Sequence, residues 1–195
     1  MDRFRDIHKG DQIIVSGLGV SAAILRDTKI GCPIIGVNDM DRLLTPDYLV
    51  VLNDYSSFAE GRWPYIKSTG AKWVFSHLDK ERLPLNDTNK LVKLNLGKRG
   101  DTSFEHGIGY TSNSPYVGVL LAHWMGAKNI GLIGVDWTDD HCFAKTGKHP
   151  LSHLFKKINA EYMSLQQDLA SRGVSLFNLS KESKLDIPRI DVSNF

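Results

Sequence analysis

The segment from residue 111 to residue 136 restricts the fold of this chain more than any other part of it. Ser114 caps a predicted helix, and Pro115 stands at the first helical position, where proline is tolerated. Apolar residues follow at the spacing of one helix face: Val117, Leu120, Leu121 and Trp124. Beyond Gly126, the run NIGLIGV at 129–135 has little polar content, which is typical of a buried strand in a parallel sheet. A helix that leads into such a strand indicates an α/β protein.

Further strands are predicted wherever a short apolar run ends in turn residues. These runs lie at 12–16, 33–37, 48–52, 72–76, 90–96 and 174–179. Helices are predicted after the first run, at 56–69 where Gly61 and Pro64 interrupt the pattern, and at 154–169. This alternation predicts an open, mostly parallel sheet of about six or seven strands with helices on both faces. We expect a single domain over residues 1–195, with polar tails at 1–10 and 180–195.

Composition excludes several classes of protein. The 24 Lys and Arg residues against 22 Asp and Glu residues leave a formal charge of +2, so a dedicated nucleic-acid surface is not expected. No run approaches the roughly 18 apolar residues that a membrane span needs, so no membrane association is expected. Cys32 and Cys142 form no CxxC pair, which argues against a disulfide framework or a structural zinc site and favours the reducing cytoplasm. The oligomeric state stays open, a homo-oligomer included.

The first predicted strand is followed by the glycine-rich turn Gly17-Leu18-Gly19-Val20-Ser21. A strand, a glycine turn and a helix form the start of a nucleotide-binding unit, because the glycines let the backbone turn tightly and the amides at the helix start can meet an anion. The third glycine of the dinucleotide fingerprint GxGxxG is replaced here by Ala22. The pattern therefore leaves a dinucleotide, a mononucleotide or no nucleotide open.

Two further strands end in the pair Asn-Asp, at Asn38 and at Asn53. A short hydrogen-bonding side chain at the carboxyl end of a parallel strand is placed to contact the base or ribose of a ligand. The alternative is that asparagine and aspartate stand there because they favour turns. Asn113 and Ser114, at the start of the helix after residue 111, are expected at the same edge of the sheet.

The loop after Asp136 carries two histidines, His141 and His149. A general base that activates a hydroxyl nucleophile should titrate near neutral pH, and histidine does so without special tuning. His149 lies in the segment TGKHP and is the candidate base, while the alternative is an ordinary surface histidine. The acids and histidines of this loop also suit magnesium or manganese beside phosphates: Asp136, Asp139, Asp140, His141 and His149. Their spacing is not diagnostic, so a metal stays unknown.

Residues 97–109 carry four glycines and mixed charges, which predicts a flexible loop or lid. Lys98, Arg99 and Lys148 could meet a phosphate, or they could form a solvated charged face. His123 lies within the apolar helix and is predicted to be structural.

Several of these features resemble the sialyltransferase-like Rossmann proteins. The matching parts are GLGVS at 17–21, the two strands that end in asparagine, and NSPYVGVLLAHWMGAKNIGLIGVDW at 113–137. That group includes bacterial cytidine-nucleotide sialyltransferases and the 6-hydroxymethylpterin diphosphokinase family. The later segments HCFAKTGKHP and FNLSKESKLDIPRI resemble bacteriophage proteins of unknown function with the same core. The resemblance covers residues 12–190 and implies a Rossmann-like nucleotide-binding domain.

The resemblance also implies roles for individual residues. Gly17, Gly19 and Ser21 would line the phosphate and sugar of the nucleotide, although Leu18 and Val20 replace the polar residue and the proline that this motif usually has. The nucleoside would face a second set of residues: Asn38, Asn53, Asn113 and Ser114. His149 would act as the general base, with His153 as the second candidate and with His141 or Asp136 orienting it.

Three functions follow as hypotheses. The leading one is a nucleotide-dependent transferase, similar to glycosyltransferases, that uses a nucleotide-sugar donor and a small-molecule or glycan acceptor and requires no cofactor. The second is a magnesium-dependent diphosphokinase of the 6-hydroxymethylpterin type, in which the acids near Asp136 hold the metal. The third is a bacteriophage protein, located in the host cytoplasm, that binds a nucleotide without turnover.

Overall fold

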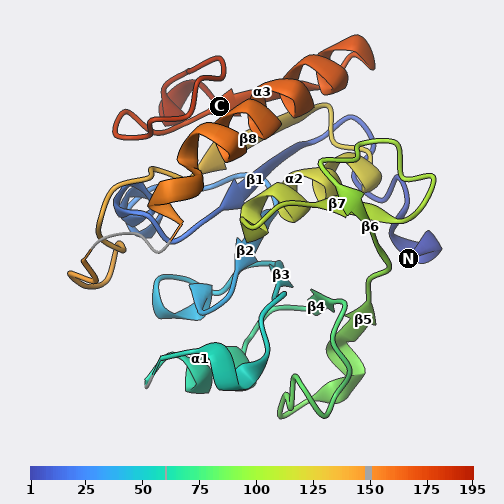
Figure 1. Ribbon diagram of the computed structural model, residues 1–195, viewed down its shortest axis with the longest axis vertical. Coiled ribbons are helices and arrows are strands. Elements are labelled where there is room, and N and C mark those ends of the chain that lie inside the picture. The colour runs from blue at the N-terminus through green and yellow to red at the C-terminus, as the bar shows by residue number, and fades with distance from the viewer. Residues whose placement is uncertain (60, 148–150) are drawn as a thin grey trace.

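The computed structural model describes residues 1–59, 61–147 and 151–195. Seven strands form its main sheet: β1 (Gln12–Ser16), β2 (Ile34–Val37), β3 (Tyr48–Val50), β4 (Trp73–Ser76), β5 (Leu91–Lys93), β8 (Asn129–Ile133) and β9 (Ser175–Asn178). All neighbours are parallel, in the order β5-β4-β3-β2-β1-β8-β9 (Figure 1). The predicted open α/β sheet is confirmed, and every run predicted as a strand contributes one.

The apolar sequences of the inner strands follow from burial on both faces of the sheet. Every residue of β2 and β3 is buried, and in β1 only Gln12, at its start, is exposed. The chain runs outward from β1 to β5 and then returns to place β8 on the other side of β1. The strand order therefore reverses between β1 and β8. In open α/β sheets, ligands bind beyond the carboxyl ends of the strands at such a reversal.

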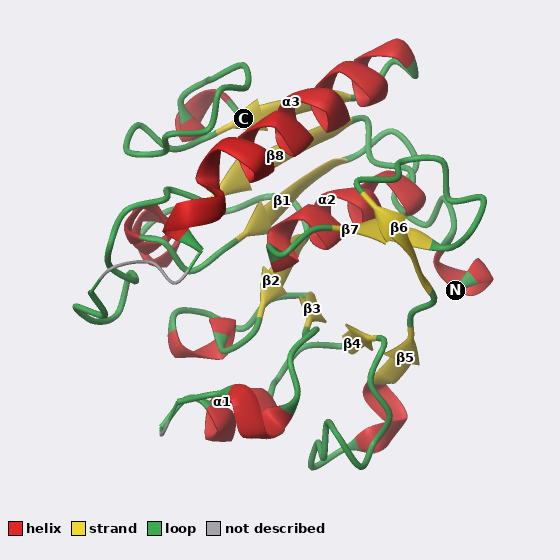
Figure 2. Ribbon diagram, in the orientation of Figure 1, coloured by secondary structure: helices red, strands yellow, loops and turns green. Residues whose placement is uncertain are grey.

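Among the described residues, three α-helices accompany the sheet: α1 (Trp63–Lys67), α2 (Ser114–Trp124) and α3 (Phe155–Ser171). The residues of α2 from Pro115 to Ala122 are all buried, so the helix is enclosed on every side and not only on the one face predicted. It contacts β1, β2, β3 and β8, and its Tyr116 ring meets Tyr162 of α3 edge-on at 5.4 Å between ring centroids. Figure 2 shows α2 and α3 in front of the sheet. Within the described ranges, no helix is long and apolar enough to cross a bilayer.

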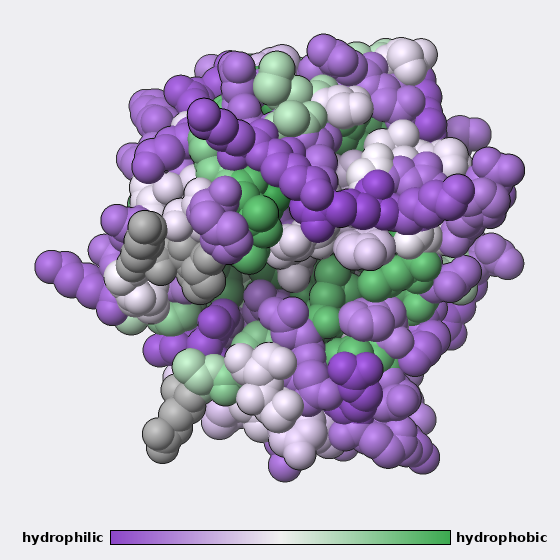
Figure 3. Space-filling view, in the orientation of Figure 1, coloured by the Kyte–Doolittle hydropathy of each residue, from purple (hydrophilic) through white to green (hydrophobic). Residues whose placement is uncertain are grey.

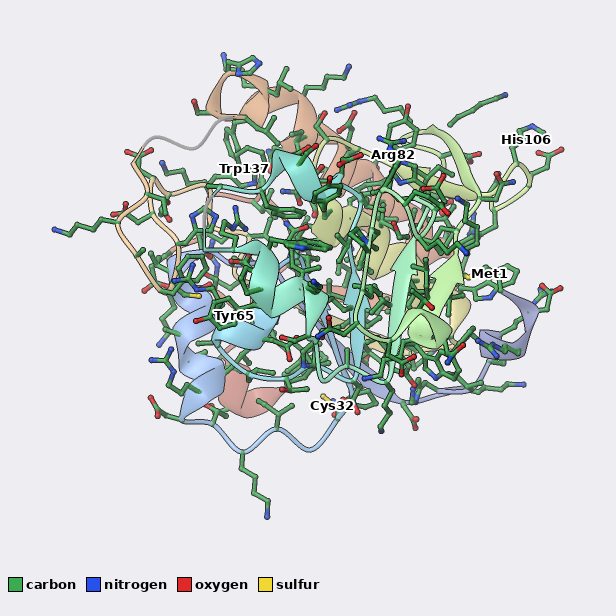
Figure 4. All side chains as sticks on the ribbon, turned by 90° about the horizontal axis from the view of Figure 1, so that it is seen from below. Met1, Cys32, Tyr65, Arg82, His106 and Trp137 are labelled. Carbon is green, nitrogen blue, oxygen red and sulfur yellow. The ribbon has the colours of Figure 1, made fainter. Side chains whose placement is uncertain are left out.

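A 3-10 helix, η2 (Val20–Arg26), replaces the α-helix predicted after β1. Its buried residues Ala22 and Leu25 are three positions apart, which is the repeat of a 3-10 helix. Figures 1 and 4 place η2 and α3 on opposite faces of the sheet. The other short 3-10 segments are η1 (Asp2–Phe4), η3 (Met40–Arg42), η4 (Tyr55–Ser57), η5 (Thr88–Lys90), η6 (Ser152–Leu154) and η7 (Val192–Asn194).

Residues 97–109 were predicted to form a flexible loop or lid; residues 100–107 are a loop, but a strand stands on each side of it. β6 (Leu96–Arg99) and β7 (Ile108–Tyr110) pair in parallel as a separate two-stranded sheet, and β7 lies against α2. Buried Ile108 anchors this unit to the core. His106, in the connection between the two strands, lies at the edge of the molecule far from Trp137 (Figure 4). The segment is therefore not a lid over the carboxyl edge of the main sheet.

Both ends of the chain contribute to the core. Phe4, in the segment predicted as a polar tail, is 4% exposed and meets the rings of Trp73 and Phe75 edge-on. In the C-terminal segment, Leu185 and Ile187 are buried. These apolar side chains hold otherwise polar segments against the sheet.

Candidate functional site

A cavity of about 360 Å³ opens at the carboxyl edge of the sheet, where the strand order reverses. The loops after β1, β2, β3 and β8 form its wall together with the start of α2. Figure 3 shows the surface hollowed between the half of the molecule that carries α3 and the half that carries α1. The cavity brings together most of the predicted site residues: Gly17, Gly19, Asn38, Asn53, Asn113, Ser114, Asp136 and His141.

The glycine turn after β1 is closed against β8. The amide of Gly17 donates to the carbonyl of Ile133 at 2.8 Å, and the amide of Gly19 donates to that of Gly134 at 2.7 Å. A Cβ atom on Gly17 would lie 2.3 Å from the carbonyl oxygen of Gly134, so no side chain fits there. The two glycines are explained by this close approach of two backbone segments. The resemblance implies that Gly17 and Gly19 line the phosphate, but their backbone amides are already bonded to carbonyl groups.

Asp136 holds this turn in place from the end of β8. Its side chain is buried, with Oδ2 accepting from the Ser21 amide at 2.8 Å and Oδ1 accepting from the Ser21 hydroxyl at 2.6 Å. Oδ1 also accepts from the Ser180 hydroxyl at 2.7 Å. Ser21 Oγ in turn accepts from the Gly134 amide at 2.9 Å. Ser21 therefore turns away from the cavity, against the prediction that it lines the nucleotide, and Asp136 has the geometry of a positioning residue.

Asn38 presents a buried acceptor at the end of β2. Its backbone adopts the left-handed conformation, with φ of 52°, and its backbone amide donates to the carbonyl of Val50 at 3.1 Å. Side-chain atom Oδ1 is buried and has no hydrogen-bond partner among the described residues, and the same is true of Thr138 Oγ1 across the cavity. A buried polar atom without a partner is costly, and a ligand that donates a hydrogen bond would relieve that cost.

Asn53 is exposed at the cavity rim beyond β3. The next residue, Asp54, is held by Arg82 at 2.8 Å and by Ser56, and these contacts lower the pKa of its carboxyl to about 2. The charged Asp54 fixes the start of η4 by accepting from the Ser56 amide. This leaves the neighbouring Asn53 side chain at the rim, as predicted.

The start of α2 forms the opposite wall. Asn113, and not Ser114, is the N-cap residue, and its side chain makes no capping hydrogen bond. Asn113 Oδ1 instead accepts from the hydroxyl of Tyr162 at 2.7 Å. The backbone amide of Asn113 donates to Thr111 Oγ1 at 3.0 Å. Burial raises the pKa of Tyr162 well above its usual range, so this tyrosine stays a donor. The bond orients the Asn113 amide group at the cavity wall.

His141 lies on the loop after β8 and lines the cavity. Its Nδ1 atom is 2.6 Å from Thr146 Oγ1, and its ring stacks on Phe143 at 5.3 Å between centroids. Asp140 stabilises the same loop by accepting from the amides of Thr146 and Gly147. The candidate base His149 and the cation Lys148 lie outside the described residues, and within the described part of the chain no group of three or more His, Cys, Asp or Glu side chains converges as metal ligands.

A pair of charged residues at the cavity was not predicted from the sequence. Asp39, at the end of β2, is completely buried and accepts two hydrogen bonds of 3.0 Å from Arg62 Nε. Arg62 lines the cavity from the segment before α1. An aspartate two residues after a fully apolar strand is a signal that a cation must be near, since a buried charge requires a partner. The sequence does not tell which cation it is.

Arg99, for which a phosphate contact and a solvated charged face were the two alternatives, has a structural partner instead. Its guanidinium donates to both carboxylate oxygens of Glu161, at 2.7 and 3.1 Å, and to Ser112 Oγ at 2.9 Å. The bidentate pair with Glu161 joins β6 to α3, and the bond to Ser112 holds the residue before Asn113. Arg99 therefore supports the cavity wall without lining the cavity in the described structure.

No family model matches the sequence, and no curated protein matches it. Solved structures share its fold. The MAf glycosyltransferase from Magnetospirillum magneticum AMB-1 has a TM-score of 0.59 at 12% identity, and the match covers 100% of this chain but only 38% of that protein.

The sialyltransferase CstII from Campylobacter jejuni, solved with the substrate analogue cytidine-5'-monophosphate, has a TM-score of 0.55 at 13% identity, over 93% of this chain and 85% of that one. A structure of the sialyltransferase CST-II with CMP and a trisaccharide acceptor has a TM-score of 0.53 at 15% identity, over 92% and 86%. At these identities the similarity is one of fold: this chain shares its α/β architecture with known glycosyltransferases.

Proposed function

We propose that this protein is a nucleotide-dependent transferase that moves a sugar from a nucleotide-sugar donor to a small-molecule or glycan acceptor. The observation that carries the proposal is the cavity at the strand reversal, where amide side chains from β2, β3 and the start of α2 converge and Asn38 Oδ1 is buried without a partner. The fold shared with glycosyltransferases that bind CMP supports the same conclusion.

In this proposal, Asn38 and Asn53 contact the nucleoside, and Asn113 and Ser114 contact the nucleotide from the opposite wall. A histidine of the loop after β8 accepts the proton of the acceptor hydroxyl as the new glycosidic bond forms and the nucleotide leaves. His149 is the candidate for this general base proposed from the sequence. His141 is the candidate among the described residues that line the cavity. The leading hypothesis needs no cofactor.

The magnesium-dependent diphosphokinase has less support from the cavity. The carboxylate of Asp136 accepts three hydrogen bonds from Ser21 and Ser180, and Asp140 accepts two from backbone amides of its own loop. Neither is prepared as a metal ligand. The diphosphokinase and a binding protein without turnover are separate outcomes of the experiment below.

Thermal unfolding with CMP, CDP, UDP, GDP, ATP and cyclic nucleotides, each with and without magnesium, tests the proposal. At about 100 times its Kd, a ligand adds about 2.7 kcal/mol, which for a chain of this size raises Tm by roughly 5 to 10 °C. We expect a cytidine nucleotide to produce such a shift without metal. Asn38→Ala should remove most of the shift, while the control Asn194→Ala, at an exposed position in η7, should keep it.

Release of nucleotide from a nucleotide sugar then tests turnover. Loss of a general base costs roughly 100-fold or more in rate, so we expect that loss from His149→Ala or His141→Ala with the ligand-induced Tm shift intact. A requirement for ATP with magnesium would support the diphosphokinase instead. Tight binding with no turnover would support a binding protein, and the absence of any nucleotide-induced shift would contradict all three.

A further inference from the structure

We propose that Arg62 is the anion receptor of the cavity and that it binds the phosphate or carboxylate group of the ligand. The inference rests on the proposed function for the nature of that ligand, and it adds the residue that takes the charge. It also moves the anion away from the glycine turn after β1, where the sequence placed it.

The glycine turn has few donors left for an anion. The amides of Gly17 and Gly19 donate to carbonyls at the end of β8. Both donors of Ser21, its amide and its hydroxyl, point at the carboxylate of Asp136. A phosphate placed at this turn would therefore approach a buried negative charge and would find these donors already occupied, which is unfavourable.

Arg62 has the opposite properties. Its Nε atom donates to both oxygens of Asp39, Nη2 donates to Asp39 Oδ1, and the guanidinium lies over the Phe58 ring at 5.5 Å from the centroid. These contacts fix one edge of the planar guanidinium. Nη1 has no hydrogen-bond partner among the described residues, and Arg62 lines the cavity. Because the guanidinium presents five N–H donors in a rigid fork, the second edge is prepared to bind a phosphate or a carboxylate.

The net charge around Asp39 also favours the binding of an anion beside Arg62. Arg42 also pairs with Asp39, with 3.8 Å between Arg42 Nη1 and Asp39 Oδ2. Two guanidinium groups against one buried carboxylate leave a local surplus of one positive charge. The acids that line the cavity, Asp136 and Asp140, are each bonded to protein donors and stand on the loop after β8. The positive end of the cavity is therefore at β2 and β3, and an anion is attracted there.

This placement orients the ligand. Its anionic group lies beside Arg62, and its nucleoside contacts Asn38 and Asn53 next to it. The rest of the ligand extends toward Asn113, Ser114 and Thr138 on the other wall. A receptor that is held rigid before binding loses little entropy when the ligand arrives, which favours affinity.

Calorimetric titration of four probes tests the inference: cytidine, CMP, inorganic pyrophosphate and N-acetylneuraminic acid, which carries a sugar carboxylate. They are titrated into the wild-type protein, R62K, R62Q and R82K. R62K keeps a positive charge for Asp39 but lacks the second edge, so it protects the fold if R62Q is unstable. R82K is the matched control, since Arg82 pairs with Asp54 in the same region and does not line the described cavity.

We expect CMP to bind the wild-type protein more tightly than cytidine does, and we expect R62K to reduce that advantage roughly tenfold or more, as loss of a charge-assisted hydrogen bond predicts. R82K should leave it unchanged. Loss of N-acetylneuraminic acid binding in R62K, with the CMP advantage kept, would identify the anion as a carboxylate and would still support the receptor.

If R62K and R62Q bind each anion with the same affinity as the wild-type protein does, the inference is overturned, while the proposed function stays intact. Pyrophosphate binding that R62K abolishes, in a protein that binds neither cytidine nor CMP, would support the receptor and contradict the nucleotide-dependent function. If no probe binds the wild-type protein, both proposals are wrong.

Discussion

At the scale of single residues, Asp136 shows how a side chain that looks catalytic in the sequence can instead organise the site. Its carboxylate joins the turn after β1 to the C-terminal segment through Ser21 and Ser180. The same network fixes the backbone on which Gly17 and Gly19 lie. The function of Asp136 is therefore expressed through the positions of its neighbours.

Asp136→Asn should lower the free energy of unfolding by about 3 kcal/mol, because the new amide group turns an N–H toward the donors of Ser21 or Ser180 in a buried place. Urea denaturation measures the change, and Asp139→Asn, at an exposed position, is the control and should change little. A variant that lost turnover but kept its full stability would instead assign Asp136 a direct part in the chemistry.

Gly19 is limited by space in the same network. A Cβ atom at this position would lie 2.5 Å from Asp136 Oδ2 and 2.8 Å from the carbonyl oxygen of Gly134. Gly19→Ala should therefore destabilise the protein by about 1 to 3 kcal/mol, the range for overpacked sites. Gly31→Ala is the matched control, because a Cβ atom there meets nothing within 4 Å. Equal stability of the two variants in urea would contradict the close packing of the turn.

At the scale of elements, α2 carries a titratable group whose charge is disfavoured by its place in the fold. His123 is half-buried near the end of the helix, with its ring 5.7 Å from that of Phe104. Burial, and then the positive charge of Arg172, lower the pKa of His123 below its usual value. Burial also lowers the pKa of His77, which follows β4.

These shifts predict how stability depends on pH. In the unfolded chain both histidines take up a proton near pH 6.5, whereas in the folded protein they do so only at lower pH, so the folded state binds fewer protons between the two values. Their stability contribution should be complete above about pH 6.5 and should be lost as the pH falls through the folded pKa values. Urea denaturation from about pH 8 to about pH 5 measures it, and H77Q/H123Q should show a shallower decrease. A decrease identical to that of the wild-type protein would assign the effect to other groups.

The loop after β8 is a second element with a specific attachment. Arg42 lies over the ring of Phe143 at 3.9 Å from the centroid, the amide of Cys142 donates to the carbonyl of Leu18 at 2.9 Å, and burial raises the pKa of the Cys142 thiol. In a C32S background, Phe143→Ala should speed the reaction of Cys142 with a thiol reagent by roughly 2-fold to 30-fold, since a cation–π contact contributes about 0.5 to 2 kcal/mol. Tyr110→Ala, an exposed ring on β7, is the control. An unchanged labelling rate would show that Phe143 does not hold the loop.

At the scale of the whole molecule, the C-terminal segment completes the carboxyl edge of the sheet. Ser183 Oγ donates to the carbonyl of Val135 at 2.8 Å, the amide of Lys184 donates to the carbonyl of Asp136 at 3.1 Å, and Leu185 is 2% exposed. The segment therefore supports the part of the site that follows β8.

A chain that ends at Glu182 should lose about 3 kcal/mol or more of its unfolding free energy, because two buried aliphatic side chains, Leu185 and Ile187, leave the core. Urea denaturation measures the loss, and Lys181→Ala is the control at a mostly exposed position. A truncated chain as stable as the full one would mean that the segment does not support the core.

The sequence predicts the sheet and much of the cavity because both depend on local patterns. Asn38 and Asn53 follow apolar runs, and residues at the carboxyl ends of parallel strands meet wherever the strands pair. It does not predict what Ser21 and Arg62 do, since their partners Asp136 and Asp39 stand 115 and 23 positions away in the chain. Such pairs depend on tertiary structure, which composition and periodicity do not contain. The two-stranded sheet at 96–110 was missed for a related reason, because its glycines are also typical of loops.

The interlocked backbone of Gly17, Gly19 and Gly134 has a consequence for how a protein of this architecture can diversify. A side chain added to Gly17 or Gly19 collides with residues 134–136, which follow β8, and one added to Gly134 lies 2.5 Å from the carbonyl oxygen of Gly17. This half of the rim therefore accepts almost no sequence variation. The side chains of Tyr55 and Tyr65, beyond β3, are exposed and are not limited by such close packing. New ligand preferences in related chains should therefore arise on the Arg62 side of the cavity, and a mutational library aimed at changed specificity belongs there.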